Sequence, residues 1–458
     1  MDNAFTITAD LDTPVSAFLK LGEFHPRFLL ESVEGGDRLG RFSFIGFGDG
    51  IEVELDGDTF RIGNDRQSLP PTTAGLLELF RSALQRAPAP APTPLPGIPF
   101  RGGLVGVTGF DLNRRFDGVR HGTGHPQARF FAPASILIFD HLTRRVALLH
   151  DGSEADRAAL ERAVRQALRG PIPPRPRITG HATPQPSLAR PDFLHAIDQA
   201  KHHITLGDVY QLVLSIRFEG ACDVPPFEAY RALRLLNPSP YLYFCDFDDL
   251  AVVGSSPEAL VRLEGRAASL RPIAGTRPRG TDPASDEALE RELLADPKEL
   301  AEHTMLVDLA RNDLGRVGVP GSIHVEPSMV VERYSHVMHI VSGVEGVLSP
   351  GRDAFDLFAA TFPAGTVVGA PKIRAMEIID DLEPVPRGFY AGTVGYFGHG
   401  TSMDQAIAIR TLTFRNGTYR YQAGAGIVAD SVPVNEHAEV LAKAAALEAA
   451  LTLAEEGL

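Results

Sequence analysis

Apolar residues recur along the chain in short runs that either alternate with polar positions or are apolar throughout. Examples are GGLVGVTGF at 102–110, VYQLVLSIRF at 209–218 and AIAIRTLTF at 406–414, each bounded by glycine, asparagine, proline or charged residues. Runs of this length and spacing are typical of strands with one or both faces buried. Further runs of this kind predict strands at 135–140, 241–247, 250–256, 259–265, 329–348, 391–398 and 419–430.

Helical spacing of apolar positions appears mainly in the second half of the chain. It predicts helices at 191–206, 226–236, 286–295, 297–312 and from 435 to the C-terminus. The helix at 297–312 opens with Asp296 as the N-cap, Pro297 at the first helical position and Glu299 in the capping-box position. Grouped strands with interspersed helices, but no strict alternation of strand and helix, predict an α+β fold.

Two proline-rich stretches, at 87–99 and 170–187, read as extended connectors. Strand-like runs follow the first, so it lies inside an N-terminal domain. The second separates that domain from the rest of the chain. We therefore predict two domains, at residues 1–185 and 186–458.

Composition narrows the class of protein. A chain of 458 residues with 44% hydrophobic content can fill a sizeable core. It has no run of about 18 apolar residues and no basic or apolar N-terminal segment, so we expect no membrane contact and a cytoplasmic location. A net charge of −14 without clustered Lys and Arg argues against a nucleic-acid partner. Cys222 and Cys245 are too few for a disulfide framework or a four-thiolate zinc site.

Two helices carry paired carboxylates. Glu299 and Glu302 are three residues apart on one predicted helix, and Glu436 and Glu439 repeat this spacing on the last, with Lys443 one turn further on. Like charges at this spacing repel, and a hard cation such as Mg²⁺ with oxygen ligands would relieve the repulsion. Acidic pairs on helices are also common as solvated faces, and the spacing alone leaves both interpretations open.

Glycine-rich turns are expected at 272–280, 362–377 and 422–431, where backbone N–H groups could face an anion. None matches a nucleotide fingerprint. Arg410 lies in an alternating predicted strand, where a lone arginine suggests either an anionic ligand or a surface ion pair. His336 and His339 would fall on opposite faces of a strand, so at most one points into a given site.

The ordered set of segments resembles the chorismate-utilising enzymes, and within them the anthranilate synthase branch. The resemblance spans the chain from LLESVEGG to the last helix. It is carried by GDVYQLVLSIRF, NPSPYLYF, GSSPEALVR, RPIAGTRPRG, KELAEHTMLVDLARND, VERYSHVMHIVS, TFPAGTVVGAPKIRAMEIID, YAGTVGYFG, AIAIRT, QAGAGIVADSVP and NEHAEVLAK. It implies large mixed or antiparallel sheets sandwiched with helices, and a lyase that converts chorismate and ammonia into anthranilate and pyruvate, the first step of tryptophan biosynthesis.

By this resemblance, Glu302 and Glu439 ligate Mg²⁺, with Glu299 and Glu436 acting through water, and the ion holds the ring carboxylate of chorismate. The remaining substrate contacts would come from Thr276, Thr366, Tyr390, Arg410, Gly424, Gly426 and Lys443.

The resemblance also implies catalytic roles. Glu258 would protonate the departing ring hydroxyl, and His339 would assist elimination of pyruvate, with His336 structural. Gln211 stands where water-adding relatives have a lysine, so it would orient ammonia. Ala274 stands where folate-branch relatives commonly have a lysine that attacks the ring.

A tryptophan feedback pocket is implied by Glu31, Ser32, Pro240 and Leu242. The chain encodes no glutaminase, so the use of glutamine would require a separate amidotransferase subunit in a hetero-oligomer. Val107 and Val368 depart from the Tyr and Ser expected in many relatives, which leaves regulatory and interface details open. Three alternatives stay open: a 4-amino-4-deoxychorismate synthase, an isochorismate synthase and a non-catalytic ligand-binding protein.

Overall fold

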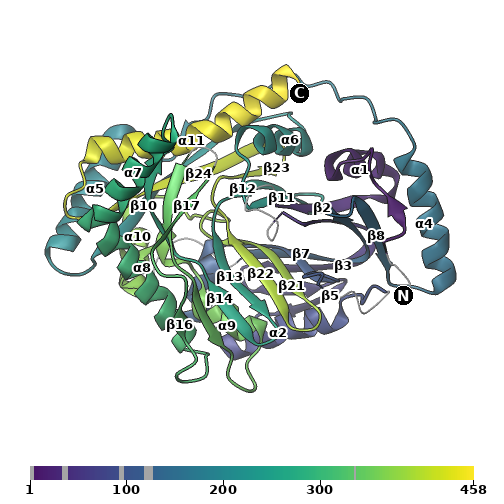
Figure 1. The fold of residues 1–458 in the computed structure, drawn as a ribbon, viewed down its shortest axis with the longest axis horizontal. Coiled ribbons are helices and arrows are strands. Elements are labelled where there is room, and N and C mark those ends of the chain that lie inside the picture. Colours follow the sequence, from purple (N-terminus) through teal and green to yellow (C-terminus); the bar gives the residue numbers. More distant parts are fainter. Residues whose placement is uncertain (1–4, 33–39, 92–96, 118–126, 335–336) are drawn as a thin grey trace.

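The computed structural model describes residues 5–32, 40–91, 97–117, 127–334 and 337–458 (Figure 1). Its described strands pair antiparallel throughout, and all but three of them form one large assembly with two arms. The first arm runs through β9 (Gln185–Pro186), β10 (Gln211–Ala221), β24 (Thr418–Ile427), β23 (Thr411–Arg415), β12 (Ala251–Ser256), β11 (Tyr241–Asp246), β2 (Pro26–Glu31) and β3 (Phe42–Asp56).

The second arm runs from β7 (Gln127–Asp140) through β6 (Gly103–Thr108), β21 (Thr393–Gly398), β22 (Ser402–Ile407), β13 (Ala259–Glu264), β14 (Ala267–Leu270) and β19 (Val344–Val347) to β16 (His324–Val325). The long strands β3 and β7 pair with each other and join the two arms. Short strands extend the margins: β4 (Thr59–Ile62), β5 (Asp65–Ser68), β8 (Arg145–His150), β1 (Ile7–Thr8) and β20 (Gly369–Ala370).

Helices cover these strands on the outside (Figure 1). α5 (Arg190–Thr205), α6 (Pro226–Leu236) and α11 (Pro433–Glu456) contact the first arm, and α10 (Lys372–Leu382) packs on β10. α2 (Thr73–Arg86) and α9 (Ala354–Thr361) pack together, while α1 (Pro14–Lys20) and α4 (Glu154–Leu168) lie beside β3 and β8. The short turns are η1 (Gly22–Phe24), η3 (Phe110–Leu112), α3 (Asn113–Phe116) and η4 (Gly365–Val367). None of the described helices is long and apolar enough to cross a membrane.

A separate small sheet holds part of the candidate site. β15 (Ile273–Pro278) pairs with β18 (Val337–Val341), which pairs with β17 (Val330–Arg333). α7 (Pro283–Ala295) and α8 (Pro297–Gly315) pack against it. Leu293, Met338 and Ile340 are fully buried between these layers.

Strands from both sides of residue 185 share one assembly. β2 pairs with β11, and β6 pairs with β21, so N-terminal strands complete both arms. One hydrophobic cluster likewise includes Leu29 and Leu137 together with Leu242 and Leu412. The division into domains at 1–185 and 186–458 stays a prediction.

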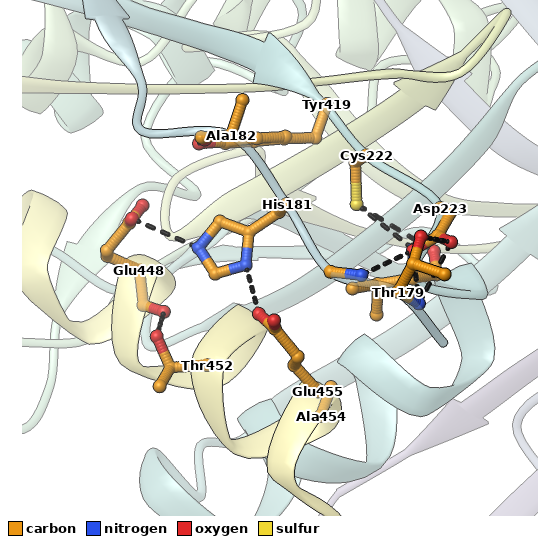
Figure 2. A network of polar contacts seen from close by, with 12 residues as sticks. Thr179, His181, Ala182, Cys222, Asp223, Tyr419, Glu448, Thr452, Ala454 and Glu455 are labelled. Atoms are coloured by element: carbon orange, nitrogen blue, oxygen red, sulfur yellow. Dashed lines mark hydrogen bonds and ion pairs between the residues drawn. The ribbon is translucent and has the colours of Figure 1, made fainter. Parts of the chain in front are cut away.

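The connector between α4 and β9 is fastened to the last helix (Figure 2). His181 Nδ1 lies 2.9 Å from Glu455 Oε2, and its Nε2 lies 3.2 Å from Glu448 Oε1. Asp223 accepts the backbone N–H of Gly180 at 2.8 Å. The expected connector at 170–187 is thus confirmed as extended chain, with β9 at its end.

Several local predictions need correction. The segment 422–431, expected as a glycine-rich turn, lies mostly in strand β24 up to Ile427. The segment 272–280 is largely the bulged strand β15 rather than a turn, because its register shifts around Gly275, whose φ is +67°. Asp296 does cap α8, accepting the N–H groups of Lys298 and Glu299. The Glu299 carboxylate, however, binds Arg277 at 3.1 Å, and the capping box is not formed.

Candidate active site

Glu258 lies at the centre of the predicted catalytic residues. It stands between β12 and β13, and its backbone carbonyl accepts the N–H of Ile407 at 3.0 Å. Burial raises the pKa of its carboxyl to about 7, although Thr366, Arg410 and Lys443 lie close enough to act in the opposite direction. A carboxyl with this pKa is about half protonated at neutral pH, as a general acid requires.

Arg410 does not lie within a strand, contrary to the sequence prediction. β22 ends at Ile407 and β23 begins at Thr411, so Arg410 occupies the crossing between the two arms with φ of +50°. The chain changes neighbours here, because β22 pairs with β13 and β23 pairs with β12. The crossing brings the guanidinium near both Glu258 and His339, whose pKa values its positive charge lowers.

His339 lies on β18, directly opposite Thr276 on β15. Its Nδ1 is 3.0 Å from the carbonyl oxygen of Gly275 and 3.0 Å from Thr276 Oγ1. A carbonyl only accepts, so Nδ1 carries the proton and Nε2 is the nitrogen that can take one up. Burial lowers the pKa of His339 and favours this neutral form. His336 lies outside the described residues.

Gly424 and Gly426 lie two residues apart on β24, closely covered by neighbouring groups, and we call this pair the glycine cradle. They pair with Ser215 and Val213 on β10. A Cβ at Gly424 would stand 2.8 Å from the Tyr390 hydroxyl, and one at Gly426 would stand 2.7 Å from Gln211 Nε2. Tyr390 and Gln211 therefore border a surface that any larger residue would fill. Burial raises the pKa of Tyr390 to about 12, so its hydroxyl is a neutral donor.

Lys443 links the cradle to the acidic pair on α11. Its Nζ donates to the carbonyl oxygen of Gly424 at 2.9 Å and lies 2.7 Å from Glu439 Oε1. The same cation also lowers the pKa of Glu258. It therefore stands between the proposed acid and the proposed metal ligand.

Glu302 and Glu439 come from different helices and lie near each other. Burial raises the pKa of Glu302, and the negative charges of Glu299 and Glu439 raise it further. Gln211 Nε2 donates to Glu302 Oε1 at 3.2 Å, which opposes this rise. Glu302 is half-buried, whereas the Glu439 side chain is 48% exposed, and two carboxylates that repel each other suit a divalent cation.

The two proposed water-mediated ligands occupy different environments. Glu299 is held by Arg277, which also binds Asp296 at 2.9 Å, whereas Glu436 is half-buried one turn before Glu439. Among the described residues, no group of three or more His, Cys, Asp or Glu side chains forms a preformed metal cage. A Mg²⁺ ion commonly takes only one or two carboxylates and completes its shell with water and substrate oxygens. The donor set fits this mode of binding.

Thr366 lies in η4, close to Glu258. Its hydroxyl acts on the pKa of Glu258, but its Oγ1 is buried without a partner in hydrogen-bond geometry among the described residues. A cavity of about 40 Å³ opens beside these two side chains, with Asp313 also in its wall. Val368, two residues on, is fully buried and serves packing. The unpaired hydroxyl is a position where a ligand could bind.

One cavity of about 980 Å³ is lined by the four predicted regulatory residues, Glu31, Ser32, Pro240 and Leu242, and Glu258 is not among its lining residues. Glu31 and Leu242 are paired between β2 and β11. The Glu31 carboxylate is engaged by the Tyr230 hydroxyl and by Arg234. Val107 is buried on β6 in the apolar cluster behind this cavity.

Several residues that contact the site were not predicted. Arg277 binds Glu299, and a buried Glu383–Arg387 pair lies behind the cradle. Glu383 and Arg387 are four residues apart, but two prolines follow the end of α10 between them, so helical spacing gave no signal.

Comparisons with known proteins show which family and fold the chain is similar to. A family profile described as chorismate binding enzyme matches residues 26–449. The anthranilate synthase component 1 of Thermus thermophilus is 44% identical, covering 99% of this chain and 98% of its own. That of Pseudomonas aeruginosa is 43% identical, with 99% and 96% covered. Among solved structures, anthranilate synthase component I from Streptococcus pneumoniae superposes with a TM-score of 0.79 at 34% identity, covering 97% of this chain and 100% of that one. The menaquinone-specific isochorismate synthase of Escherichia coli shares the fold, with a TM-score of 0.71 at 22% identity, covering 96% of this chain and 92% of its own.

Proposed function

The chain belongs to the chorismate binding enzyme family, and we propose that it is the chorismate-converting component of an anthranilate synthase. The family resemblance and the α+β fold predicted from the sequence are confirmed. The reaction would be that of a lyase: chorismate and ammonia give anthranilate, pyruvate and water. The observation that supports the proposal is that the charge of Glu439 on α11 acts on Glu302 on α8, while Lys443 contacts both Glu439 and Gly424 and acts, together with Arg410, on a protonatable Glu258.

Substrate binding would use the cations and the cradle. Mg²⁺ bound by Glu302 and Glu439 would neutralise and orient the ring carboxylate of chorismate. Arg410, Tyr390 and the backbone near Gly424 would receive the enolpyruvyl carboxylate. The close approach of the Tyr390 hydroxyl to Gly424 supports this role, because the absence of a Cβ lets a neutral donor lie beside that backbone.

The chemistry would proceed in two steps. Ammonia, oriented by Gln211, adds to the carbon next to the ring carboxylate, while Glu258 donates a proton to the departing hydroxyl, which leaves as water. His339 Nε2 then takes a proton from the carbon that carries the amino group. The electron pair of that C–H bond completes the aromatic ring as the C–O bond breaks, and the enolpyruvyl group leaves as the enolate of pyruvate, which takes up a proton on its methylene carbon to give pyruvate. The hydrogen bond from Nδ1 to Gly275 supports this role, because it holds the ring with Nε2 unprotonated.

Two residues favour this reaction over the alternatives. Gln211 is an amide and cannot activate water as a lysine would, which disfavours isochorismate synthesis. Ala274 is buried on β15 and has no nucleophile to attack the ring, which disfavours the folate-branch mechanism. A purely binding role would leave the raised pKa of Glu258 without a use.

The proposal includes partners and regulation. The two cysteines lie outside any nucleophile elbow, and burial raises the pKa of Cys222 to about 11, so ammonia from glutamine would need a separate amidotransferase subunit. Tryptophan would bind in the cavity lined by Glu31, Ser32, Pro240 and Leu242. The size of that cavity and its walls of aromatic and polar residues support an amino acid of this kind. A cytoplasmic location stays a prediction.

The test is to supply the purified chain with chorismate, Mg²⁺ and ammonium at alkaline pH and to identify the product. We expect anthranilate, recognised by its fluorescence and mass, together with equimolar pyruvate. Glutamine in place of ammonium should give no product from this chain alone. Release of isochorismate or an aminodeoxychorismate as the end product would refute the proposal, and so would binding without turnover.

A further inference from the structure

Arg387 is a fully buried arginine that is not among the residues predicted to contact the substrate. Its side chain is 1% exposed, and that of its partner Glu383 is 5% exposed. The guanidinium binds the carboxylate through two parallel contacts, Nε to Oε2 at 2.9 Å and Nη2 to Oε1 at 2.7 Å. A buried pair of this kind costs desolvation energy, so further bonds must offset that cost.

The further bonds of Arg387 reach two walls of the candidate site. Nη1 donates to the carbonyl oxygen of Val367 at 2.7 Å, directly after Thr366 in η4. Nη2 donates to the carbonyl oxygen of Val213 at 2.8 Å, on the strand that pairs with the glycine cradle. One planar group therefore ties the Thr366 turn to β10.

Tyr390, which forms a third wall of the candidate site, also lies close to the Arg387 guanidinium. The Arg387 carbon Cζ is 5.6 Å from the ring centroid of Tyr390 and 4.8 Å from that of Phe110. The N–H of Tyr390 also donates to the carbonyl oxygen of Arg387 at 3.2 Å, which closes a tight turn. A cation–π contact with the guanidinium favours this position of the Tyr390 ring, whose hydroxyl lies near Gly424.

Glu383 connects Arg387 to the strand that pairs with the glycine cradle. Its Oε1 accepts the backbone N–H of Ser215 at 2.9 Å and the Ser215 hydroxyl at 2.7 Å. Ser215 stands opposite Gly424 in the β10–β24 register, and a Cβ at Gly424 would be 3.1 Å from its Cβ. The ion pair thus fixes the backbone directly beneath the cradle.

We propose that Arg387, through Glu383, is a positioning residue that sets the distances between Thr366, Tyr390 and Gly424 in the substrate pocket. The inference rests on the proposed function, because these three residues are its predicted chorismate contacts. Only arginine offers a planar fork with donors on both edges and a face that stacks. A lysine has the charge but cannot bind the carboxylate through two parallel contacts while it also donates to both the Val367 and the Val213 carbonyl oxygens.

The test compares Arg387→Lys and Ser215→Ala with the wild type. Ser215→Ala removes the hydroxyl bond to Glu383 and the bond that this hydroxyl accepts from Gln422 Nε2, but it keeps the backbone N–H bond to Glu383 and is the milder perturbation. Arg81→Lys serves as the matched control, because Arg81 makes a forked contact with Asp353 at the joint of α2 and α9, apart from the site. Chorismate affinity is measured by calorimetry with Mg²⁺ and without ammonium, kcat and KM with ammonium, and Tm in parallel.

We expect Arg387→Lys to raise the Kd and KM for chorismate by about tenfold, which equals about 1.4 kcal/mol, with a smaller effect on kcat. Ser215→Ala should raise both by about threefold, roughly 0.7 kcal/mol. Arg81→Lys should lower Tm while its Kd and KM stay at the wild-type values. A purely structural role would instead lower Tm and the active fraction, and so kcat, at unchanged Kd and KM.

If Arg387→Lys lowers Tm and kcat but leaves Kd and KM unchanged, the inference is overturned. If Arg387→Lys does not fold, Ser215→Ala decides, and a wild-type Kd in that variant overturns it. A wild type that binds chorismate but forms no anthranilate contradicts the proposed function and leaves this comparison of affinities intact. A wild type that does not bind chorismate contradicts both.

Discussion

Replacement of Glu258 by glutamine tests two properties of this residue: its role as a proton donor and the raised pKa that burial gives it. Glutamine keeps the shape of the side chain but carries no proton to donate. Loss of a positioned general acid typically costs about 10²–10⁴ in rate, so kcat should fall by this factor while chorismate still binds. The same substitution should also change how stability depends on pH.

The sign of that dependence follows from the pKa. Burial raises the pKa of Glu258 from 4.5 to about 7, so between these values the folded protein holds a proton that the unfolded chain releases. Wild-type stability contributed by this group is therefore greatest below pH 4.5, falls as pH rises, and levels off above about 7. Glutamine does not titrate. The Tm of Glu258→Gln minus that of the wild type should accordingly increase between pH 5 and pH 8.

The expected change in stability with pH that Glu258 causes is modest. A rise from 4.5 to about 7 corresponds to roughly 3 kcal/mol at about 1.4 kcal/mol per pH unit. Because the residue is partly exposed, solvent screening reduces this to about 1–2 kcal/mol. For 458 residues the unfolding entropy is about 1 kcal/mol/K, so the difference in Tm should change by about 1–2 °C.

The assay is a pair of thermal melts at pH 5 and pH 8 without Mg²⁺, alongside initial rates with ammonium. Glu287→Gln, an exposed carboxylate on α7, is the control and should show neither effect. A difference in Tm that is the same at both pH values would refute the buried, protonated carboxyl. A kcat within about threefold of the wild type would refute the catalytic role.

Three further outcomes are expected. Glu302→Gln and Glu439→Gln should each raise the Mg²⁺ concentration for half-maximal rate at least about tenfold, and variant titrations that match the wild type would contradict this. Wild-type Mg²⁺ affinity should also fall as pH falls, because burial and neighbouring carboxylates raise the pKa of Glu302. His339→Gln should accumulate the amino intermediate, detected by mass, while anthranilate formation slows; equal slowing of both steps would count against its assignment to elimination. Tryptophan at about 100 times its Kd should stabilise the wild type by about 2.7 kcal/mol and inhibit turnover, and both effects should weaken in Ser32→Ala; a chain that neither melts higher nor slows with tryptophan would rule out the regulatory cavity.

The elements that carry the site were largely predictable, because their signals are local. The N-cap and proline at the start of α8, and the apolar periodicity that includes Leu306, place Glu302 on a definite helix face. Alternation in 209–218 correctly gave the strand that carries Gln211. The carboxylate spacing could not decide between a solvated face and a metal site. That decision depends on whether α8 and α11 approach each other, and no local pattern encodes such an approach.

Arg410 shows why the remaining geometry of the site could not be predicted from the sequence pattern. Its segment alternates like a strand, and strands do occupy both sides of it. The crossing arises because β22 must pair with β13 in one arm and β23 with β12 in the other, a consequence of tertiary pairing. The positive φ that results is uncommon for arginine and carries an energetic cost. The same backbone places one guanidinium beside both Glu258 and His339, so the segment that strand propensity misread is the one that assembles the proposed acid and base around a single cation.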